Sequence, residues 1–113
     1  MAQRDLIDLE HLDRYVAGDR SLRDEILGIF EEQAEMWTRM LDPTAEDQAW
    51  RDAAHALKGA SRGVGAWDVG DTCQAAEKLI GTARDENVRA AVLRDLQRQV
   101  SETVAEVRRL RDL

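Results

Sequence analysis

The sequence predicts an all-α fold, an up-and-down antiparallel four-helix bundle with a short additional N-terminal helix. Aromatic residues make up only 4% of the chain and it has a single proline, a composition that favours helices over a strand-rich architecture. Apolar residues recur at spacings of three and four, the period of an amphipathic helix. The polar links between these periodic segments are short, as an up-and-down bundle requires.

Length and composition favour one globular domain over residues 1–113. A chain of 113 residues builds a single core and has no room for an added nucleotide-binding lobe. No apolar run approaches the roughly 20 residues that span a bilayer, and no signal-like segment begins the chain. The single cysteine, Cys73, can form no internal disulfide. We therefore expect a cytoplasmic protein that does not enter a membrane.

Two helices are expected in the first forty residues. The segment Asp5–Ala17 has apolar side chains at helical spacing and stops at Gly18. Ser21 can cap the second helix, with carboxylates in its first turn. Methionines and a tryptophan near the end of this helix are expected to fill the core. The apolar positions of the second helix are Leu22, Ile26, Ile29, Phe30, Met36 or Trp37, Met40 and Leu41.

Pro43 ends the second helix, because proline disfavours a helical residue before it and has no backbone N–H. Thr44 is expected to open the third helix. With Asp47 three positions on, Thr44 resembles a capping box that has aspartate in place of glutamate. The third helix then runs through His55.

Three glycines fall near the end of the third helix, where each costs about 1 kcal/mol relative to alanine. A compensating role is therefore expected for each. We expect close helix packing at Gly63 and a C-terminal cap at Gly65. Gly59 points outward with His55, so the approach of another molecule explains it better than packing within the domain.

Two further helices complete the bundle. The fourth is expected from about Trp67 to Thr82, with Cys73 among its inward residues, followed by a polar link at residues 85–87. The last segment forms a regular apolar seam. We expect this seam to pack within the domain rather than in an intermolecular coiled coil, and so expect a monomer. The seam residues are Leu93, Leu96, Val100, Thr103, Val107 and Leu110.

The third helix places His55, Lys58 and Gly59 together on one face. At about 100° per residue, Arg51 and Arg62 lie on the same side. An imidazole lone pair can accept and later release a phosphoryl group, provided that positive charge and little bulk surround it. The chain has no phosphate-binding glycine loop and no kinase signature, so a partner must bring the phosphate. The opposite, core-facing side carries Trp50, Ala53, Leu57, Ala60 and Val64.

The run from His55 to Ala66 resembles the signature of histidine-containing phosphotransfer domains, in which His-x-x-Lys-Gly and two small residues lead through an apolar residue to Gly or Ala. Comparable elements lie elsewhere along most of the chain, at Gly18-Asp19, at Phe30, and at Cys73 with Glu77. The resemblance implies a helical-bundle phosphoryl carrier that acts in two-component phosphorelays. Such a carrier has no kinase activity of its own.

Carried over by position, the resemblance implies that His55 is phosphorylated, that Lys58 helps to hold the phosphoryl oxygens, and that Gly59 lets partner loops come close. The implied partners are receiver domains of response regulators and a hybrid histidine kinase. The receiver supplies Mg²⁺ and an aspartate, and no intrinsic cofactor is expected. Arg51 and Arg62 suit the acidic pocket of such a receiver.

Two assignments remain open from sequence. Some family members use glutamine on the following helix to touch the histidine, and Glu77 stands at that place; it either contacts His55 or pairs with a lysine. A second set of residues forms either an exposed apolar docking patch beside His55 or part of the core, because periodicity does not separate the two. This set is Leu12, Tyr15, Val16 and Ile29.

Other functions are less consistent with the sequence. A net charge of −7 argues against binding to nucleic acid or to an anionic membrane. Two histidines and one cysteine show no metal-ligand spacing, so no metal site is expected, and His11 is expected to be a solvated helix residue. The competing hypothesis is a helical adaptor or inhibitor that binds a histidine kinase or response regulator without carrying phosphate.

Overall fold

In the computed structural model, which describes residues 4–112, the chain forms five α-helices and one short 3₁₀ helix, with no strand among the described residues. The all-α prediction is confirmed. The helices are α1 (Leu9–Val16), α2 (Arg20–Met40), α3 (Asp47–Gly63), α4 (Trp67–Glu77) and α5 (Glu86–Arg111), with the 3₁₀ helix η1 (Gly81–Ala83) before α5. No helix in this part of the chain has the length and apolar character needed to cross a membrane.

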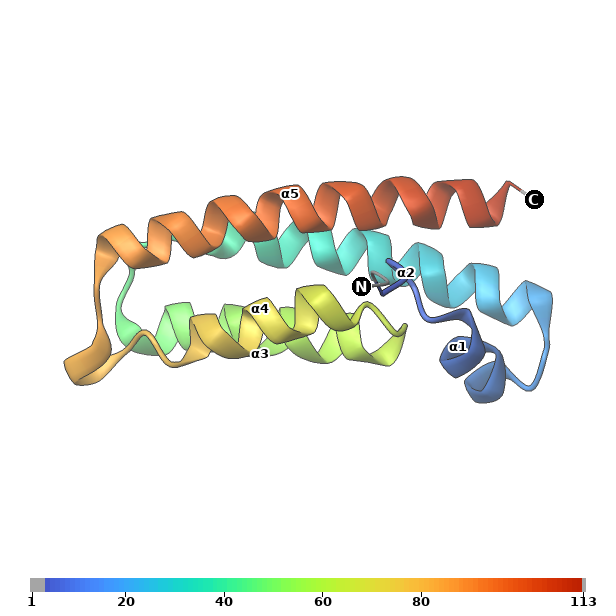
Figure 1. The fold of residues 1–113 in the computed structure, drawn as a ribbon, viewed down its shortest axis with the longest axis horizontal. Coiled ribbons are helices and arrows are strands. Elements are labelled where there is room, and N and C mark those ends of the chain that lie inside the picture. The colour runs from blue at the N-terminus through green and yellow to red at the C-terminus, as the bar shows by residue number, and fades with distance from the viewer. Residues whose placement is uncertain (1–3, 113) are drawn as a thin grey trace.

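The bundle consists of two helix pairs. The long helices α2 and α5 lie side by side, and the shorter α3 and α4 form a second pair against them (Figure 1). Successive helices from α2 to α5 run in opposite directions, as predicted for an up-and-down bundle. The helix α1 lies beneath the end of α2 and α5 that α3 and α4 do not reach.

Helix starts differ from the sequence expectations because several residues able to cap lie near each start. The first helix begins at Leu9 rather than near Asp5, because Asp8 caps it by accepting the N–H of His11. Asp19, not Ser21, caps α2 by accepting the N–H of Leu22. The predicted stop near Gly18 is confirmed, since Ala17 and Gly18 both have positive φ.

The predicted capping box at Thr44 is wrong. Thr44 bonds Asp42, through both its backbone N–H and its hydroxyl, and α3 begins three residues later at Asp47. Asp47 instead accepts the N–H of Gly81 and an N–H from each of two arginines, Arg84 and Arg89. Its carboxylate therefore joins the start of α3 to the connection between α4 and α5.

In the second half of the chain, the end of α4 and the start of α5 differ from the sequence predictions. The fourth helix ends at Glu77 rather than near Thr82, and η1 occupies part of the expected extension. Residues 85–87 are not a link: Asp85 caps α5 by accepting the N–H groups of Asn87 and Val88. The predicted seam of α5 is confirmed, with Leu93 half-buried and the other five residues buried.

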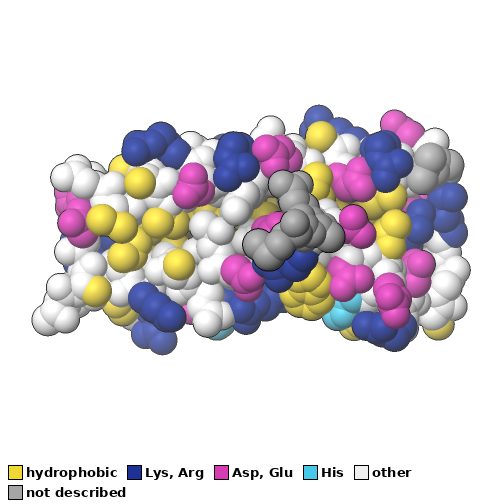
Figure 2. All heavy atoms as spheres, viewed as in Figure 1, with side chains coloured by type: hydrophobic (Ala, Val, Ile, Leu, Met, Phe, Trp, Pro, Cys, Tyr) yellow, Lys and Arg dark blue, Asp and Glu magenta, His cyan; other side chains and the backbone are white. Residues whose placement is uncertain are grey.

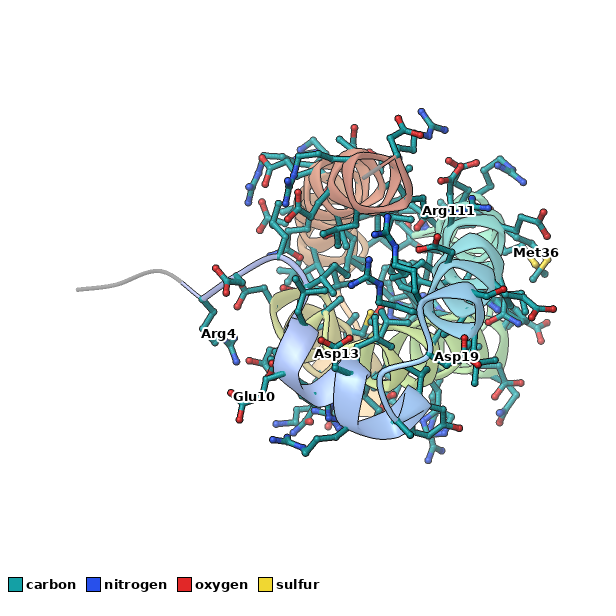
Figure 3. The ribbon with its side chains drawn as sticks, turned by 90° about the vertical axis from the view of Figure 1, so that its right-hand side faces the viewer. Arg4, Glu10, Asp13, Asp19, Met36 and Arg111 are labelled. Carbon is teal, nitrogen blue, oxygen red and sulfur yellow. The ribbon has the colours of Figure 1, made fainter. Side chains whose placement is uncertain are left out.

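The core lies between the helix pairs and contains most, though not all, of the predicted residues. Trp50 and Leu57 of α3, Cys73 of α4 and Leu96 of α5 are fully buried. On α2 the buried side chains are Leu27, Phe30 and Ala34. The prediction that the methionines of α2 fill the core is wrong, because Met36 is 38% and Met40 57% exposed, and Met36 points away from the helices (Figure 3).

A buried arginine completes the core at the end opposite α1. Arg89 has no exposed surface, and its guanidinium lies 4.9 Å from the ring centroid of Trp50. Burying a charge is costly unless it is paired, and here every side of the group has a partner. The acceptors are the carbonyl oxygens of Leu79, Pro43 and Ala45 and the carboxylate of Asp47.

Candidate functional site

His55 lies near the middle of α3, on the side turned away from the core. Its side chain is 71% exposed, whereas Trp50, Ala53 and Leu57 of the same helix, and Val64 directly after it, are buried. Their 3- and 4-residue spacing fixes the rotation of α3, because burying this stripe turns the opposite side to solvent. The predicted outward presentation of the imidazole is therefore present in the structure.

Glu77, at the last turn of α4, contacts the imidazole. The His55 Nδ1 and Glu77 Oε1 atoms are 3.1 Å apart. An ionised carboxylate only accepts hydrogen bonds, so this pair assigns the Nδ1 atom as the protonated one. The Nε2 atom of a neutral ring then carries the lone pair, away from Glu77.

Lys58 holds the same carboxylate. Its Nζ lies 2.9 Å from Oε1 and 3.0 Å from Oε2 of Glu77. Burial raises the pKa of the Glu77 carboxyl, but the hydrogen bonds from Lys58 and His55 outweigh this effect and lower its pKa below the ordinary value. Both alternatives left open by the sequence therefore hold, because Glu77 contacts the histidine and pairs with the lysine.

Lys58 is more enclosed than its position in the helix suggests. Its side chain is 17% exposed, and its ammonium lies between α3 and α4 against Glu77. The carboxylate thus ties the lysine and the imidazole to one point on α4. A lysine ammonium thus lies on the same carboxylate as the His55 imidazole, and positive charge near such a ring favours a phosphoryl group on it.

Gly59 leaves the backbone next to His55 uncovered. A Cβ atom built at Gly59 would meet no atom of residues 4–112 within 4 Å apart from its own stretch of helix, and the same holds for Gly63 one turn later. The expectation of close helix packing at Gly63 is therefore wrong. Gly65 caps the helix as predicted: its φ is +78°, and a Cβ there would lie 2.7 Å from the Asp8 side chain.

The two open glycines form one wall of an apolar groove between α2 and α3. The groove has a volume of about 230 Å³. Tyr15 of α1 also lines it, and Gln33 of α2 is a polar residue among the lining side chains. The lining residues are Tyr15, Ile26, Ile29, Phe30, Gln33, Gly59, Ala60, Gly63 and Val64.

The predicted apolar docking patch is half correct. Tyr15 is 73% and Ile29 49% exposed, and both line the groove. Leu12 and Val16 are 0% and 3% exposed, so they cannot form part of a docking surface. The reason is the phase of α1: positions 12 and 16 share one face, which packs inward, while position 15 lies on the outer side.

The two predicted arginines differ in their surroundings. Arg51 is exposed and forms no hydrogen bond or ion pair with any residue from 4 to 112. Arg62 is half-buried: it donates to the side-chain oxygen of Gln74, lies 3.9 Å from Asp71, and packs over Gly70. Arg51 is thus available to a partner, whereas Arg62 is largely engaged with α4.

The structure adds residues that the sequence reasoning missed. Lys78 follows Glu77 and lies exposed beside the site, and Gln74, one turn earlier on α4, lines the same region. Gln33 is a polar break in the apolar stripe of α2. The sequence does contain a signal for both glutamines: Gln74 lies three positions before Glu77 and Gln33 four positions after Ile29, so each shares a helix face with a predicted site residue.

Two other residues considered in the sequence analysis, Cys73 and His11, lie outside the site. Cys73 is fully buried one turn before Glu77, and burial raises the pKa of its thiol to about 12. His11 is half-buried and meets the ring of Trp67 edge-on, with centroids 4.9 Å apart, so it is not a freely solvated residue. Within residues 4–112 no three His, Cys, Asp or Glu side chains converge as a metal site would require.

Comparison with known proteins identifies the family of the chain. The family model of the Hpt domain matches residues 20–111. In structure, the chain is similar to the histidine phosphotransferase ShpA from Caulobacter crescentus, with 36% sequence identity and a TM-score of 0.59 over 90% of this chain and 97% of that chain. A comparison with curated proteins gives no match. The chain, whose exposed histidine on α3 contacts Glu77 on α4, belongs to the Hpt domain family.

Proposed function

We propose that this protein is a phosphorelay intermediate that carries a phosphoryl group on Nε2 of His55. The observation that supports it most directly is the pairing of His55 Nδ1 with Glu77 on a ring that is 71% exposed. This pairing orients the ring and leaves the opposite nitrogen open to an in-line approach. The family match and the similarity to a histidine phosphotransferase support the same function.

The transfer itself needs little from this chain beyond placement and charge. The Nε2 lone pair forms a bond to phosphorus while the bond from phosphorus to the partner's aspartyl oxygen breaks, and the aspartate leaves as a carboxylate. The Nδ1–H stays bonded to Glu77 and supports the positive charge that develops on the ring. Lys58 contributes positive charge to the phosphoryl oxygens. The reverse step returns the group to an aspartate.

The proposed partners are receiver domains of response regulators and a hybrid histidine kinase. The groove between α2 and α3 offers apolar surface to a partner helix, and Gly59 allows its loops to approach His55. The partner receiver supplies Mg²⁺ from its own acidic pocket. Both signs of charge are mixed over the face drawn in Figure 2, which lacks the continuous basic surface that nucleic acid requires.

We further propose that the protein acts as a cytoplasmic monomer, without autonomous kinase activity. The sequence has no glycine-rich phosphate-binding loop that would hold a nucleotide. Incubation of the purified protein with ATP and Mg²⁺ alone should leave His55 unlabelled. Acid-labile label on His55 under these conditions would contradict a pure carrier role.

The variant His55→Gln tests the carrier function against the adaptor alternative. Glutamine keeps a polar side chain on the exposed face but offers no nucleophilic ring nitrogen. Each phosphorylated receiver domain of the source organism should be mixed with wild-type protein and with the variant, and label should be followed over time. We expect transfer to wild type, none to the variant, and receiver binding by both. A variant that supports the pathway normally would favour the adaptor.

A further inference from the structure

A shallow hollow lies on the α4 side of His55, opposite the apolar groove. It is formed where the exposed faces of α3 and α4 meet, and its volume is about 670 Å³. Glu77, whose carboxylate contacts the His55 Nδ1 atom, is one of its lining residues, so Glu77 connects the hollow to the imidazole. The lining residues are Arg51, Lys58, Gln74, Glu77, Lys78 and Ile80.

The hollow is positively charged on a chain that is negatively charged overall. It contains three cations, Arg51, Lys58 and Lys78, and one carboxylate, Glu77, whereas the whole chain has a net charge of −7. The carboxylate is already engaged by Lys58 and His55. Arg51 and Lys78 are exposed and form no ion pair with residues 4–112.

The two sides of His55 therefore present different chemistry. At about 100° per residue, Arg51 and Lys58 lie on one side of His55 around α3, and Gly59 and Gly63 lie on the other. The glycine side opens into the apolar groove and the cationic side into the hollow. Any partner that reaches His55 over this surface meets apolar contacts on one flank and unpaired positive charge on the other.

We infer that Arg51 and Lys78 form a recognition site for carboxylates on a receiver domain, placed on the α4 side of the phosphoryl group. This inference rests on the proposed phosphotransfer function and extends it to the orientation of the partner. The receiver seats apolar surface on the groove, and its acidic surface lies over the hollow. Reversing the partner would place carboxylates on the groove and apolar atoms on the cations, which is unfavourable on both flanks.

Two cations at the edge of an interface act mainly on the rate of encounter. Their attraction for an acidic partner speeds association and is screened by salt. Because this chain has a net charge of −7, such a local positive patch also reduces the repulsion that an acidic surface would otherwise meet on approach. The hollow should thus determine how fast and in which orientation a receiver docks, and the chemical step should depend on His55, Lys58 and Glu77.

The test is the double charge reversal Arg51→Glu with Lys78→Glu. The matched control is Arg39→Glu with Arg94→Glu, which changes the net charge equally at two exposed arginines outside both the groove and the hollow. Transfer from each receiver that phosphorylates wild type is measured against receiver concentration, at low salt and at about 0.5 M salt. Receiver binding is measured in parallel by titration calorimetry.

We expect the Arg51 and Lys78 variant to lose roughly 10-fold in second-order transfer rate at low salt, with the deficit shrinking at high salt. The loss should appear in the concentration dependence rather than in the limiting rate. The control should stay within about twofold of wild type. Transfer that is unaffected by the double reversal, or slowed equally by the control, would overturn the inference.

The outcome also separates this inference from the proposed function. If wild type takes no label but binds a receiver, the phosphotransfer proposal is wrong, and the calorimetric comparison of the two variants decides the role of the hollow. If wild type neither takes label nor binds any receiver, both proposals are wrong.

Discussion

The indole Nε1–H of Trp50 on α3 donates a hydrogen bond of 2.8 Å to the carbonyl oxygen of Ala76 on α4. Ala76 directly precedes Glu77, so this buried bond fixes the position of Glu77 along the axis of α3. Because Trp50 lies five positions before His55 and is fully buried, the core sets the spacing between the carboxylate and the imidazole. The exposed site is thus positioned by an interior contact.

The variant Trp50→Phe should weaken both the fold and the site. It removes the bond to Ala76 and part of the ring beneath Arg89, and we expect a loss of about 1–3 kcal/mol in the free energy of unfolding, measured with urea. Phosphotransfer should also slow, because the position of Glu77 relative to His55 is no longer fixed by this bond. Trp37→Phe on α2, a half-buried position, is the control and should leave transfer unchanged.

Replacing Glu77 should reduce transfer without removing the acceptor. In Glu77→Ala the ring loses its anchor, and we expect a roughly 10- to 100-fold slower transfer to His55. Glu77→Gln keeps an oxygen that accepts the Nδ1–H and should retain a larger part of the rate. Nitrogen-15 NMR of His55 should show Nδ1 as the protonated atom of the neutral ring in wild type, with mixed tautomers in the alanine variant. The same tautomer ratio in both proteins would contradict the positioning role of Glu77.

Lys58→Ala should slow transfer by roughly 10-fold or more, because positive charge near the phosphoryl oxygens is lost. The ammonium is partly buried against Glu77, so we also expect about 1 kcal/mol of lost stability, measured by thermal or urea unfolding. Lys58→Arg keeps the charge and should recover part of the rate. An alanine variant with normal transfer would show that the ammonium only braces Glu77.

A large side chain at position 59 should block docking and leave the fold intact. The leucine side chain of Gly59→Leu would point into open space from an α-helix, so the substitution should not lower the melting temperature. Gly59→Ala is the control, because its methyl group adds little bulk and raises helix propensity by about 1 kcal/mol. We expect the leucine variant to lose receiver binding in a titration while the alanine variant keeps it.

The contacts of Asp8 predict a pH dependence in the attachment of α1. The N–H groups of Trp67 and His11 lower the pKa of the Asp8 carboxyl below its ordinary value of 3.8. A group with a depressed folded-state pKa stabilises the fold above its unfolded pKa, and this contribution disappears as the pH falls through the folded value.

Asp8→Ala should therefore melt below wild type at neutral pH, and the two melting temperatures should converge at pH values below 3.8. Hydrogen exchange should locate the weakening in α1 and in the turn between α3 and α4, where the Asp8 N–H also bonds Gly65. A difference that persists unchanged into acid would show that Asp8 acts through its shape and not its charge.

Much of the site could be predicted from sequence because its central residues are close together on one helix. The spacing of His55, Lys58 and Gly59 places them on one face, and the stripe from Trp50 to Val64 establishes which face is outward. Glu77 lies on another helix, and its position could be inferred only from the family resemblance. Its simultaneous contacts with His55 and Lys58 depend on how α3 and α4 pack.

The errors share a physical origin in tertiary context. Several acceptors near each helix start compete to cap it, and Asp47 turned out to serve Gly81, Arg84 and Arg89 instead of its own helix. Apolar residues also outnumber the places in the core, so periodicity alone did not separate buried Leu12 from exposed Met36. Burial of Arg89 could not be foreseen, because its acceptors lie far away in sequence.

The open surface at Gly59 and Gly63 also bears on how long a partner stays bound. Immobilising flexible side chains on binding costs conformational entropy, about 0.5–1.5 kcal/mol for each rotamer-rich group. Glycine has no rotamers, and the α3 backbone is already ordered by its hydrogen bonds. This part of the surface can therefore be covered and released with little reordering, which suits a carrier that must exchange one short-lived partner for another.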